Sequence, residues 1–508
     1  MIIRAVFLLL LLVAPSGARC GTLPGGFDTT LAAAVFGTAV AFITPRALAP
    51  VTPPQLTLWG LHGLSSIDPQ LVADEQGDEL RLSAGTRLLF QRPAPPGNDA
   101  TAWGQAAADM AASAWTTSPA LRQAGTQGVI QGFFNEMFNH FDPYSRYIAP
   151  RGAVLERGRL AGQGGAGISL VGNGRVVISD IVPDGPAQDA GLRVGDRILS
   201  VDGVPVRGQT ADEVMNQLNG PRDTHVVLRV RGRDGSVRTA DIVRALVPPE
   251  TVFANGDGAL LVIRITAFSS NTAQRLSQAL EAGLHGPVAP HGVVIDLRGD
   301  RGGLLRQAVT AVALVQNEGL VVTTAGRHPQ SVHEWRVEGG DLTNGLPLVV
   351  LVDGHSASAA EIMAAALADR GRAVVVGSVT LGKGLVQTIT QLPDGGELFV
   401  TWSRVLAPLG WPLQGLGVMP QVCTSLGHAE TKRQLHDLLH GIVDMAAPLQ
   451  ASREARAPLD PERVLALREA CPAAEGGDDD VEAARFLVEH PPAYQAALIG
   501  GPALSGSP

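Results

Sequence analysis

Lysine is almost missing from this sequence. Of the 39 Lys and Arg residues among 508, only Lys383 and Lys432 are lysines. Arginine keeps its proton in proteins, so among the Lys and Arg side chains only these two can act as a base. Lys383 has no other cation between Arg372 and Arg404. It is therefore a candidate general base, and a lysine on a surface turn is the alternative.

Basic runs are also absent. The formal net charge is −9, which excludes nucleic acid as a principal partner. Hydrophobic residues make up 45% and charged residues 17% of the chain, a balance typical of globular proteins and not of disordered ones. At roughly 150 residues per domain, the length indicates about three domains.

Cysteine is scarce, with three residues in the chain. Cys423 and Cys471 would form a pair if the protein folds in an oxidising compartment, and two unrelated buried thiols are the alternative. No group of Cys, His, Asp and Glu shows the spacing of metal ligands. The sequence therefore predicts no metal and no cofactor.

The first apolar run is too short to span a bilayer. It covers residues 5–13, follows Arg4, and precedes small residues that allow cleavage after Ala18. This pattern predicts a signal peptide over 1–18 and export of the protein, to the periplasm of a Gram-negative cell and otherwise to the surface or medium. No stable membrane span would then remain, and an apolar N-terminal helix is the alternative. Arg19 disfavours lipidation of Cys20.

Four regions follow with different patterns. Residues 25–150 are predicted to form a helical domain in which two stretches each end at an Asp-Pro pair. Residues 160–245 predict a small β-rich domain, because short β-branched runs alternate with turns. Residues 250–422 alternate apolar strands with helices, which indicates an α/β core with a buried sheet. Residues 428–500 predict further helices.

Within these regions several elements have clear limits. One amphipathic helix is expected over 211–218, and a strand over 260–265 precedes a helix near 272–283. Another strand over 346–352 runs into a turn and then into a helix that begins at 358.

That strand–turn–helix junction contains Ser358, where a hydroxyl would face outward and helix N–H groups would face a developing oxyanion. A serine that only caps the helix is the alternative. Gly354-His355-Ser356-Ala357-Ser358 also approaches the G-x-S-x-G pattern, which would make Ser356 the nucleophile, but its last position is not glycine. His355 suggests a Ser-His-Asp triad, although a histidine so near in the turn would face elsewhere.

Four motifs between residues 132 and 422 carry a resemblance to a known family. In order, they are Phe141-Asp142-Pro143-Tyr144-Ser145-Arg146-Tyr147, Asp296-Leu297-Arg298-Gly299-Asp300-Arg301-Gly302-Gly303, Ser356-Ala357-Ser358-Ala359-Ala360-Glu361-Ile362 and Thr380-Leu381-Gly382-Lys383-Gly384-Leu385-Val386-Gln387. Together they resemble the C-terminal processing peptidases, also called tail-specific proteases. Asp300 stands where the family usually has Asn, Leu381 where it has Phe, and Ala360 where it has Ser.

The resemblance implies a serine endopeptidase of Ser-Lys type with a ClpP/crotonase-like α/β core. Ser358 would be the nucleophile, Lys383 the general base and Gln387 the residue that orients the lysine. The oxyanion donors would be backbone N–H groups at Ala359 and in the Gly302-Gly303 turn.

A working base near neutral pH must be desolvated, because a free lysine has a pKa of ~10.4. The apolar neighbours Leu381, Leu385 and Val386 are expected to provide this environment.

The β-rich region resembles a PDZ domain of the permuted bacterial kind. Gly165, Ala166, Gly167 and Ile168 would form the loop that binds a terminal carboxylate, and the strand after it, which includes Leu170, would pair with the peptide. The implied partners are protein or peptide C-termini.

Two alternative functions remain. A PDZ-type scaffold with an inactive catalytic fold would lack Ser358 or Lys383, and both are present. A crotonase-like acyl-CoA enzyme would share the Gly-Gly turn, but the PDZ-like domain and the export signal argue against it. The sequence carries no signal for a natural substrate or an oligomeric state.

Overall fold

The computed structural model describes residues 26–182, 185–257 and 259–499. The predicted signal peptide over 1–18 and Cys20 lie outside them. By its contacts the chain divides into two compact units. Among the described residues, one unit comprises 26–40 with 53–140, and the other comprises 41–52 with those from 141 to 499.

The N-terminal unit is mainly helical. Its helices are α1 (Thr29–Arg46, partly in the other unit), α2 (Pro53–Leu61), α3 (Gly63–Ile67), α4 (Ala100–Thr117) and α5 (Pro119–Phe138). Phe36 of α1 stacks on Phe133 of α5 with ring centroids 3.9 Å apart. A Cβ at Gly63 would lie 2.3 Å from the Gly132 carbonyl oxygen, so glycine allows α3 and α5 to touch. α3 ends at the residue before the Asp68-Pro69 pair, as predicted.

This unit also contains a three-stranded antiparallel sheet that the sequence analysis did not predict. Its strands are β1 (Leu71–Gln76), β2 (Glu79–Ala84) and β3 (Arg87–Pro93), in that order across the sheet. Leu71, Ala73, Leu80 and Leu82 are buried, so alternate residues of β1 and β2 point into the unit.

Among the described residues, one helix is long and apolar enough to cross a membrane, namely α1 with a mean hydropathy of 1.2. Ala32, Val35, Phe36 and Ala39 of this helix are buried within the protein. Contacts with other helices, such as the stacking of Phe36 on Phe133 of α5, bury this face of α1.

The β-rich domain has a mixed order of strands around one helix. Its main sheet runs β11-β10-β8-β7-β6, with β6 (Ile168–Val171), β7 (Val177–Ile181), β8 (Arg197–Val201), β10 (His225–Arg231) and β11 (Val237–Val243). β9 (Val204–Pro205) pairs with β8, and β5 (Gln163–Gly165) pairs with β12 (Ala245–Val247). Helix α8 (Ala211–Leu218) has the predicted limits and begins with a capping box formed by Thr210 and Glu213. A short helix, α7 (Pro186–Asp189), precedes β8.

The α/β core is built on a six-stranded sheet of order β13-β14-β15-β18-β19-β22. Its strands are β13 (Val252–Asp257), β14 (Leu260–Ile265), β15 (Gly292–Asp296), β18 (Leu348–Val352), β19 (Val374–Gly377) and β22 (Val422–Cys423). All neighbours pair in parallel except the edge strand β13. Every residue of β15, β18 and β19 is buried, as the continuous apolar runs predicted.

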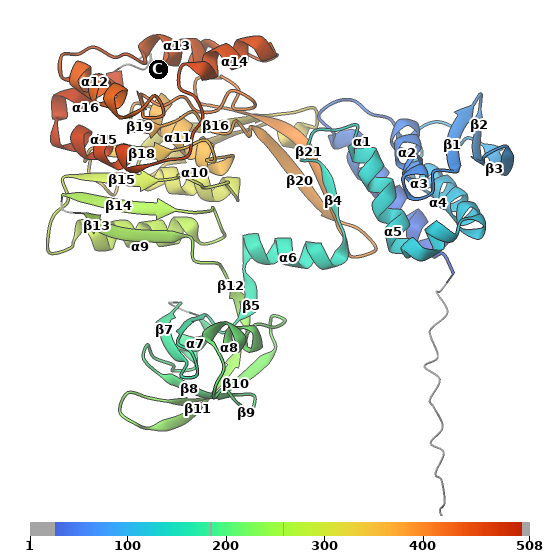
Figure 1. The fold of residues 1–508 in the computed structure, drawn as a ribbon, viewed down its shortest axis with the longest axis horizontal. Helices are drawn as coiled ribbons and strands as arrows, with labels where there is room; N and C mark the ends of the chain where they lie inside the picture. Colours follow the sequence, from blue (N-terminus) through green and yellow to red (C-terminus); the bar gives the residue numbers. More distant parts are fainter. Residues whose placement is uncertain (1–25, 183–184, 258, 500–508) are drawn as a thin grey trace, which may run out of the picture. The chain divides into compact units, whose positions relative to one another are not determined.

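Helices cover both faces of this sheet (Figure 1). On one face lie α9 (Thr272–Leu284), α10 (Leu305–Ala313) and α11 (Ala359–Asp369). On the other lie α12 (His428–Leu439), α15 (Asp478–Glu489) and α16 (Pro491–Ile499). These three C-terminal helices are thus a layer of the core and not a free tail. The shorter helices α13 (Ala446–Glu454) and α14 (Pro461–Glu469) lie between α12 and α15 in the chain.

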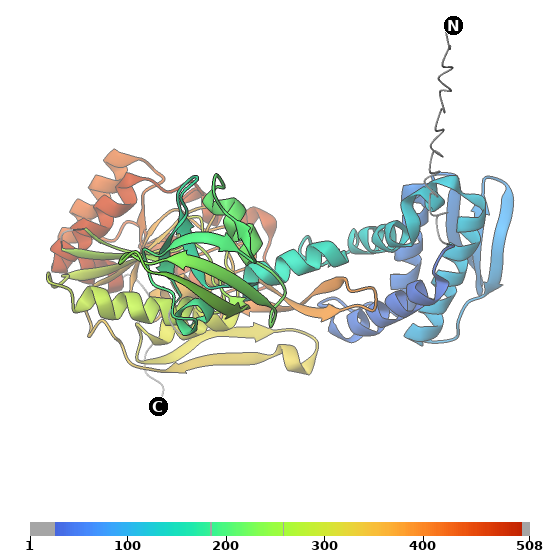
Figure 2. The ribbon, with the colours of Figure 1, turned by 90° about the horizontal axis from the view of Figure 1, so that it is seen from below.

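A second sheet, of order β17-β16-β21-β20, adjoins the first. Its strands are β16 (Glu318–Ala325), β17 (His333–Glu338), β20 (Leu385–Gln391) and β21 (Glu397–Leu406), and β4 (Arg146–Ile148) pairs with β21. The 3-10 turn η1 (Pro329–Ser331) closes the β16–β17 hairpin (Figure 2). Helix α6 (Pro150–Ala161) follows β4 and leads to the β-rich domain.

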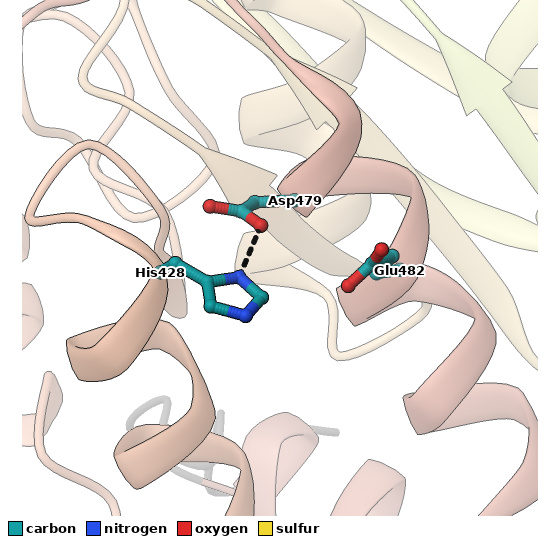
Figure 3. A group of neighbouring side chains, drawn as sticks. All are labelled: His428, Asp479 and Glu482. Atoms are coloured by element: carbon teal, nitrogen blue, oxygen red, sulfur yellow. Dashed lines mark hydrogen bonds and ion pairs between the residues drawn. The ribbon is translucent and has the colours of Figure 1, made fainter.

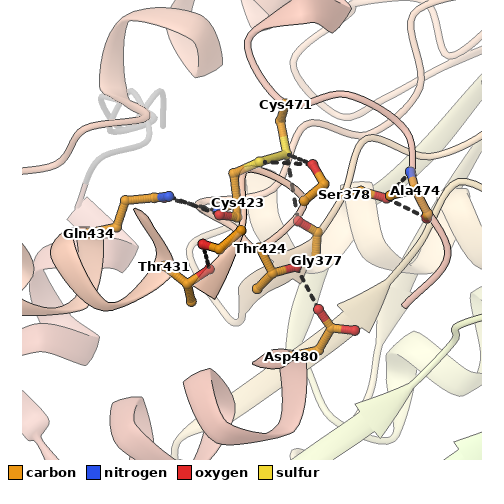
Figure 4. Close-up of a disulfide and its surroundings, with 11 residues drawn as sticks. Gly377, Ser378, Cys423, Thr424, Thr431, Gln434, Cys471, Ala474 and Asp480 are labelled. Atoms are coloured by element: carbon orange, nitrogen blue, oxygen red, sulfur yellow. Dashed lines mark hydrogen bonds between the residues drawn. A yellow bond between two sulfur atoms is a disulfide. The ribbon is translucent and has the colours of Figure 1, made fainter. Parts of the chain in front are cut away.

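Cys423 and Cys471 form a disulfide with their Cα atoms 5.8 Å apart (Figure 4). The bond joins β22 to the segment that follows α14. Nearby, the Thr424 hydroxyl donates to Asp480 Oδ1 at 2.6 Å, so the same region is also tied to α15. Of the two alternatives that the sequence left open, the structure has the disulfide.

Removing this bond should lower stability. The disulfide closes a separation of 48 residues, and a loop of that size is expected to contribute about 2–4 kcal/mol to the free energy of unfolding. We expect urea denaturation of Cys423→Ser/Cys471→Ser to give a free energy of unfolding that is lower by this amount. The urea midpoint of the variant should not change with reductant, whereas that of the wild type should fall when the disulfide is reduced. Equal midpoints for reduced and oxidised wild type would contradict the prediction.

Candidate active site

Ser358 lies at the start of α11, after a tight turn that follows β18. Its backbone has φ 57° and ψ −112°, a conformation that side-chain-bearing residues adopt at a cost of about 1–3 kcal/mol. The turn is held by Asp353, whose Oδ1 accepts hydrogen bonds from the N–H groups of His355 and Ser356 at 2.9 Å each. Ser358 lies in the wall of a pocket.

Ser356 and His355 have other surroundings. Ser356 is fully buried, and its Oγ donates to the Leu297 carbonyl at 2.8 Å. His355 is exposed. Neither lines the pocket that contains Ser358. The geometry therefore favours Ser358 over Ser356 and gives no support to a histidine triad.

Lys383 comes to the same pocket from the loop between β19 and β20. It is half-buried, and its Nζ lies 4.9 Å from the ring centroid of Tyr144. Leu385 is buried and Val386 half-buried, as expected for shielding, but Leu381 is 46% exposed and cannot contribute. Tyr144, for which no role was expected from the sequence, supplies an aromatic face beside Lys383 instead. Burial, with the charges of Glu361 and Asp142, raises the pKa of Tyr144, so its hydroxyl is neutral at physiological pH.

Glu361 connects the serine turn to the lysine loop. Its buried carboxylate accepts hydrogen bonds from the N–H groups of Ser358 (2.7 Å), Gly382 (2.7 Å) and Lys383 (2.8 Å). The Thr380 hydroxyl also donates to it. Burial raises the pKa of Glu361, while these four donors lower it. One side chain thus fixes both segments, a role that the sequence analysis did not assign.

The Gly302-Gly303 turn lies against Ser358. A Cβ at Gly302, where φ is +92°, would lie 2.8 Å from the Ser358 Cβ, so only glycine fits. The Gly302 N–H donates to Asp300 Oδ1 at 2.7 Å and is not available to another acceptor while this bond stands. In the part of the chain that the structure describes, no acceptor is bonded to the N–H of Gly303 or of Ala359. Of the three expected oxyanion donors, two are thus open.

Gln387 lies on β20 and lines the same pocket. Its Nε2 donates to the Leu385 carbonyl at 3.2 Å and to Thr401 Oγ1 at 3.1 Å. Thr401 Oγ1 in turn donates to Asp142 Oδ1 at 2.7 Å. Asp142 belongs to the first of the four motifs, so this chain of bonds anchors the Gln387 amide.

The pocket has a volume of about 270 Å³ and is lined by both polar and apolar residues. Arg146, Glu156 and Arg301 add charges to its wall. Its apolar lining consists of Leu304, Leu305, Ile362, Leu385, Val386, Ile389, Phe399 and Val405.

An ion-pair network fixes the loop that leads to the Gly-Gly turn. Arg298 makes two 2.8 Å bonds to Asp296 and one of 3.0 Å to Asp480 on α15. These hydrogen bonds, that to Asp296 above all, raise the pKa of Arg298, and the ion pairs are largely buried. The C-terminal helices therefore help to hold the active-site loop.

The β-rich domain presents an edge strand beside the predicted carboxylate loop. β6 is the last strand of its sheet and also contacts α8. Gly167 has φ +71°, while Ala166 and Ile168 are buried and Leu170 is half-buried. Gly165 lies on β5 beside β12. A free strand edge next to a helix is the arrangement that allows β-augmentation by a peptide.

The fold brings together one group of side chains that the sequence spacing did not indicate as metal ligands. His428, Asp479 and Glu482 place ligand atoms within 4.8 Å of one another (Figure 3). His428 Nδ1 already bonds to Asp479 Oδ1 at 2.6 Å, and Lys432 lies in the wall of the same pocket. His428 is the first residue of α12 and Asp479 lies in the first turn of α15, where the helix dipole favours acids and disfavours a cation. The group is better explained as a His–Asp pair at two helix N-termini.

Known proteins of the family inferred from the four motifs are similar to this chain. The model of "Peptidase family S41" matches residues 259–424, and the PDZ domain model matches 155–231. The chain is 32% identical to the carboxy-terminal-processing protease of Bartonella bacilliformis over 359 residues, which cover 68% of this chain and 82% of that protein. It is also 32% identical to carboxy-terminal processing protease CtpA of Bacillus subtilis, over 59% of this chain and 64% of that one.

Among solved structures, the photosystem II D1 C-terminal processing protease is 28% identical, covering 76% of this chain and 97% of that chain, with a TM-score of 0.36. The family models and the Bartonella relative confirm the resemblance inferred from the four motifs. They do not favour an inactive scaffold. The chain therefore belongs to the carboxy-terminal-processing proteases of peptidase family S41 and is a serine peptidase with a PDZ domain.

Proposed function

We propose that Ser358 is the nucleophile and Lys383 the general base of this peptidase. The observation that carries the proposal is that both residues line one pocket from two loops, which Glu361 joins through hydrogen bonds. Neutral Lys383 takes the Ser358 hydroxyl proton as Oγ attacks the peptide carbonyl carbon. The amine leaves with that proton, and water then hydrolyses the acyl-enzyme ester.

The N–H groups of Gly303 and Ala359 are our candidates for the oxyanion donors. Ala359 is the first residue of α11, so the helix dipole adds to its N–H. Gly302 could join them only if its bond to Asp300 opens. Gln387 is assigned to orienting Lys383, a role supported by its anchored amide nitrogen.

We infer that the substrate is a protein C-terminal segment with an apolar residue at the cleavage site. The apolar lining of the pocket supports the second part of this inference. Its first part rests on the PDZ domain, in which Gly165, Ala166, Gly167 and Ile168 would bind the terminal carboxylate. Residues of β6, with Leu170 among them, would pair with the peptide.

Export of the protein is part of the proposal. A structural disulfide between Cys423 and Cys471 is typical of an oxidising compartment such as the periplasm. The apolar run over residues 5–13 and the small residues before Ala18 fit a signal peptide.

A test of capture compares one apolar-ended peptide as the free acid and as the C-terminal amide. Charge-assisted hydrogen bonds to a carboxylate are worth roughly 1.5–3 kcal/mol each, so amidation should raise KM about tenfold or more and leave kcat unchanged. Gly167→Trp, which blocks the loop, should raise KM for the free acid to the same extent. Steady-state kinetics with both peptides give these values.

The matched control is Gly235→Trp, since Gly235 also has a positive φ but lies in the β10–β11 turn of the same domain. It should leave KM unchanged, and neither variant should affect a reporter peptide too short to reach the PDZ domain. Equal cleavage of acid and amide at subsaturating concentration would end the C-terminal capture proposal.

A further inference from the structure

Asp300 is buried beside the Gly-Gly turn, at the position where the motif usually has Asn. Its side chain has no exposed surface. Its backbone is bonded on both sides, with its N–H donating to Leu297 (3.1 Å) and its carbonyl accepting from Ala357 (2.8 Å). Asp300 therefore links the loop after β15 to the turn that carries Ser358.

The two carboxyl oxygens of Asp300 differ in their hydrogen bonding. Oδ1 accepts the hydrogen bond from the Gly302 N–H at 2.7 Å. Oδ2 is buried, and the described part of the chain offers it no hydrogen-bond partner. A charged oxygen without a partner is far more costly to bury than a hydroxyl, so this environment favours the neutral acid.

The Asp300–Gly302 bond has a consequence for the next peptide unit. The Gly302 carbonyl accepts from the Phe268 N–H at 3.1 Å. Because the peptide is planar and trans, the Gly303 N–H points the opposite way from that carbonyl. Asp300 on one side and Phe268 on the other thus fix the direction of a proposed oxyanion donor.

The charged groups on the neighbouring elements are already engaged elsewhere. Arg298, on the same loop, pairs with Asp296 and Asp480. From the turn before α11, Asp353 accepts bonds from the turn's own N–H groups and from that of Gly299.

Glu361 on α11 binds the serine and lysine segments, while Arg301 and Lys383 line the pocket. No ion pair to Asp300 occurs among the described residues. Burial accordingly raises the pKa of Asp300 to about 8, and the hydrogen bond from Gly302 lowers it only in part.

We propose that Asp300 is a positioning residue of the oxyanion turn and acts as a neutral carboxylic acid. It orients the Gly302-Gly303 peptide without placing a negative charge beside the developing oxyanion. When Asp300 loses its proton, the new charge opposes that of the oxyanion and the rate falls. This inference rests on the proposed function of Ser358 and of the Gly303 N–H.

The test compares kcat/KM of the wild type and of Asp300→Asn between pH 6 and pH 10, on a peptide without titrating side chains. Asparagine keeps an acceptor oxygen for Gly302 but cannot ionise. We expect kcat of the wild type to fall at least tenfold between pH 8 and pH 10, while its KM stays unchanged. The kcat of Asp300→Asn should change less than twofold over that interval. The kcat of Asp300→Ala should be lower than that of the wild type and of Asp300→Asn at every pH. The same alkaline loss in Asp300→Asn, or a wild-type kcat in Asp300→Ala, would overturn the proposal.

A second measurement requires no catalysis. The group has a higher pKa in the folded protein than in the unfolded chain, so its stabilising effect is complete below the unfolded pKa and is lost as pH rises toward the folded value. The urea midpoint of the wild type minus that of Asp300→Asn should therefore fall between pH 4 and pH 8 and stay constant above. A difference that does not change with pH would refute a neutral Asp300, whatever the kinetics. A wild type without any peptidase activity would instead refute the proposed function.

Discussion

Replacing Ser358 by alanine is expected to lower kcat by at least about 10,000-fold, because no other hydroxyl in the pocket can form the acyl-enzyme. Lys383→Ala should have a similar effect, since the serine then has no base. Lys383→Arg should be equally inactive, because a guanidinium cannot give up its proton at accessible pH. Initial rates on an unfolded protein substrate, with labelling of Ser358 by a fluorophosphonate, measure all three effects.

The chain offers matched controls for both residues. Lys432→Arg changes the one other lysine, which lies on α12, and should leave the rate unchanged. His355→Ala removes an exposed side chain and should cost less than twofold. An active Lys383→Arg variant, or labelling that moves to Ser356, would show that the assignment of base or nucleophile is wrong.

Much of the fold follows from periodicity in the sequence. Helix α8 and strand β14 have the predicted limits, and α9 differs by one residue, because each carries an uninterrupted pattern with a turn or cap at its ends. The β1–β2–β3 sheet was missed because its short strands carry charged residues on the exposed side and lie between two helical stretches. The local pattern there gives a weak strand signal, and the sheet exists because Leu80 and Leu82 pack into the unit.

Those candidate site residues that lie in the sequence motifs could be predicted. Ser358 and Lys383 could be proposed from the sequence, since each occupies a distinctive segment. Tyr144 was not, because its contact with Lys383 joins residues far apart in the sequence. The hydrogen bond from the Gly302 N–H to Asp300 could not be predicted either, since it depends on the direction of the Asp300 side chain. The group formed by His428, Asp479 and Glu482 arises only when α12 and α15 lie side by side.

Glu361→Gln is expected to have the second largest effect, on both activity and stability. Oε1 of Glu361 accepts from Gly382 and Thr380, while Oε2 accepts from Ser358 and Lys383. An amide has a single acceptor oxygen, so two buried donors lose their partner and face an NH2 group instead. At about 1–3 kcal/mol for each unpaired donor, the free energy of unfolding should fall by about 2–6 kcal/mol.

The catalytic effect of this variant is separable from the loss of stability. Because Ser358 and Lys383 are both held through the same carboxylate oxygen, a shift on the order of 1 Å is expected to lower kcat about 100-fold with little change in KM. The rate should be measured at a temperature at which circular dichroism shows the variant fully folded. Glu489→Gln, at an exposed position of α15, is the matched control and should behave as the wild type. A folded Glu361→Gln variant with wild-type kcat would show that this carboxylate stabilises the core without positioning the two catalytic segments.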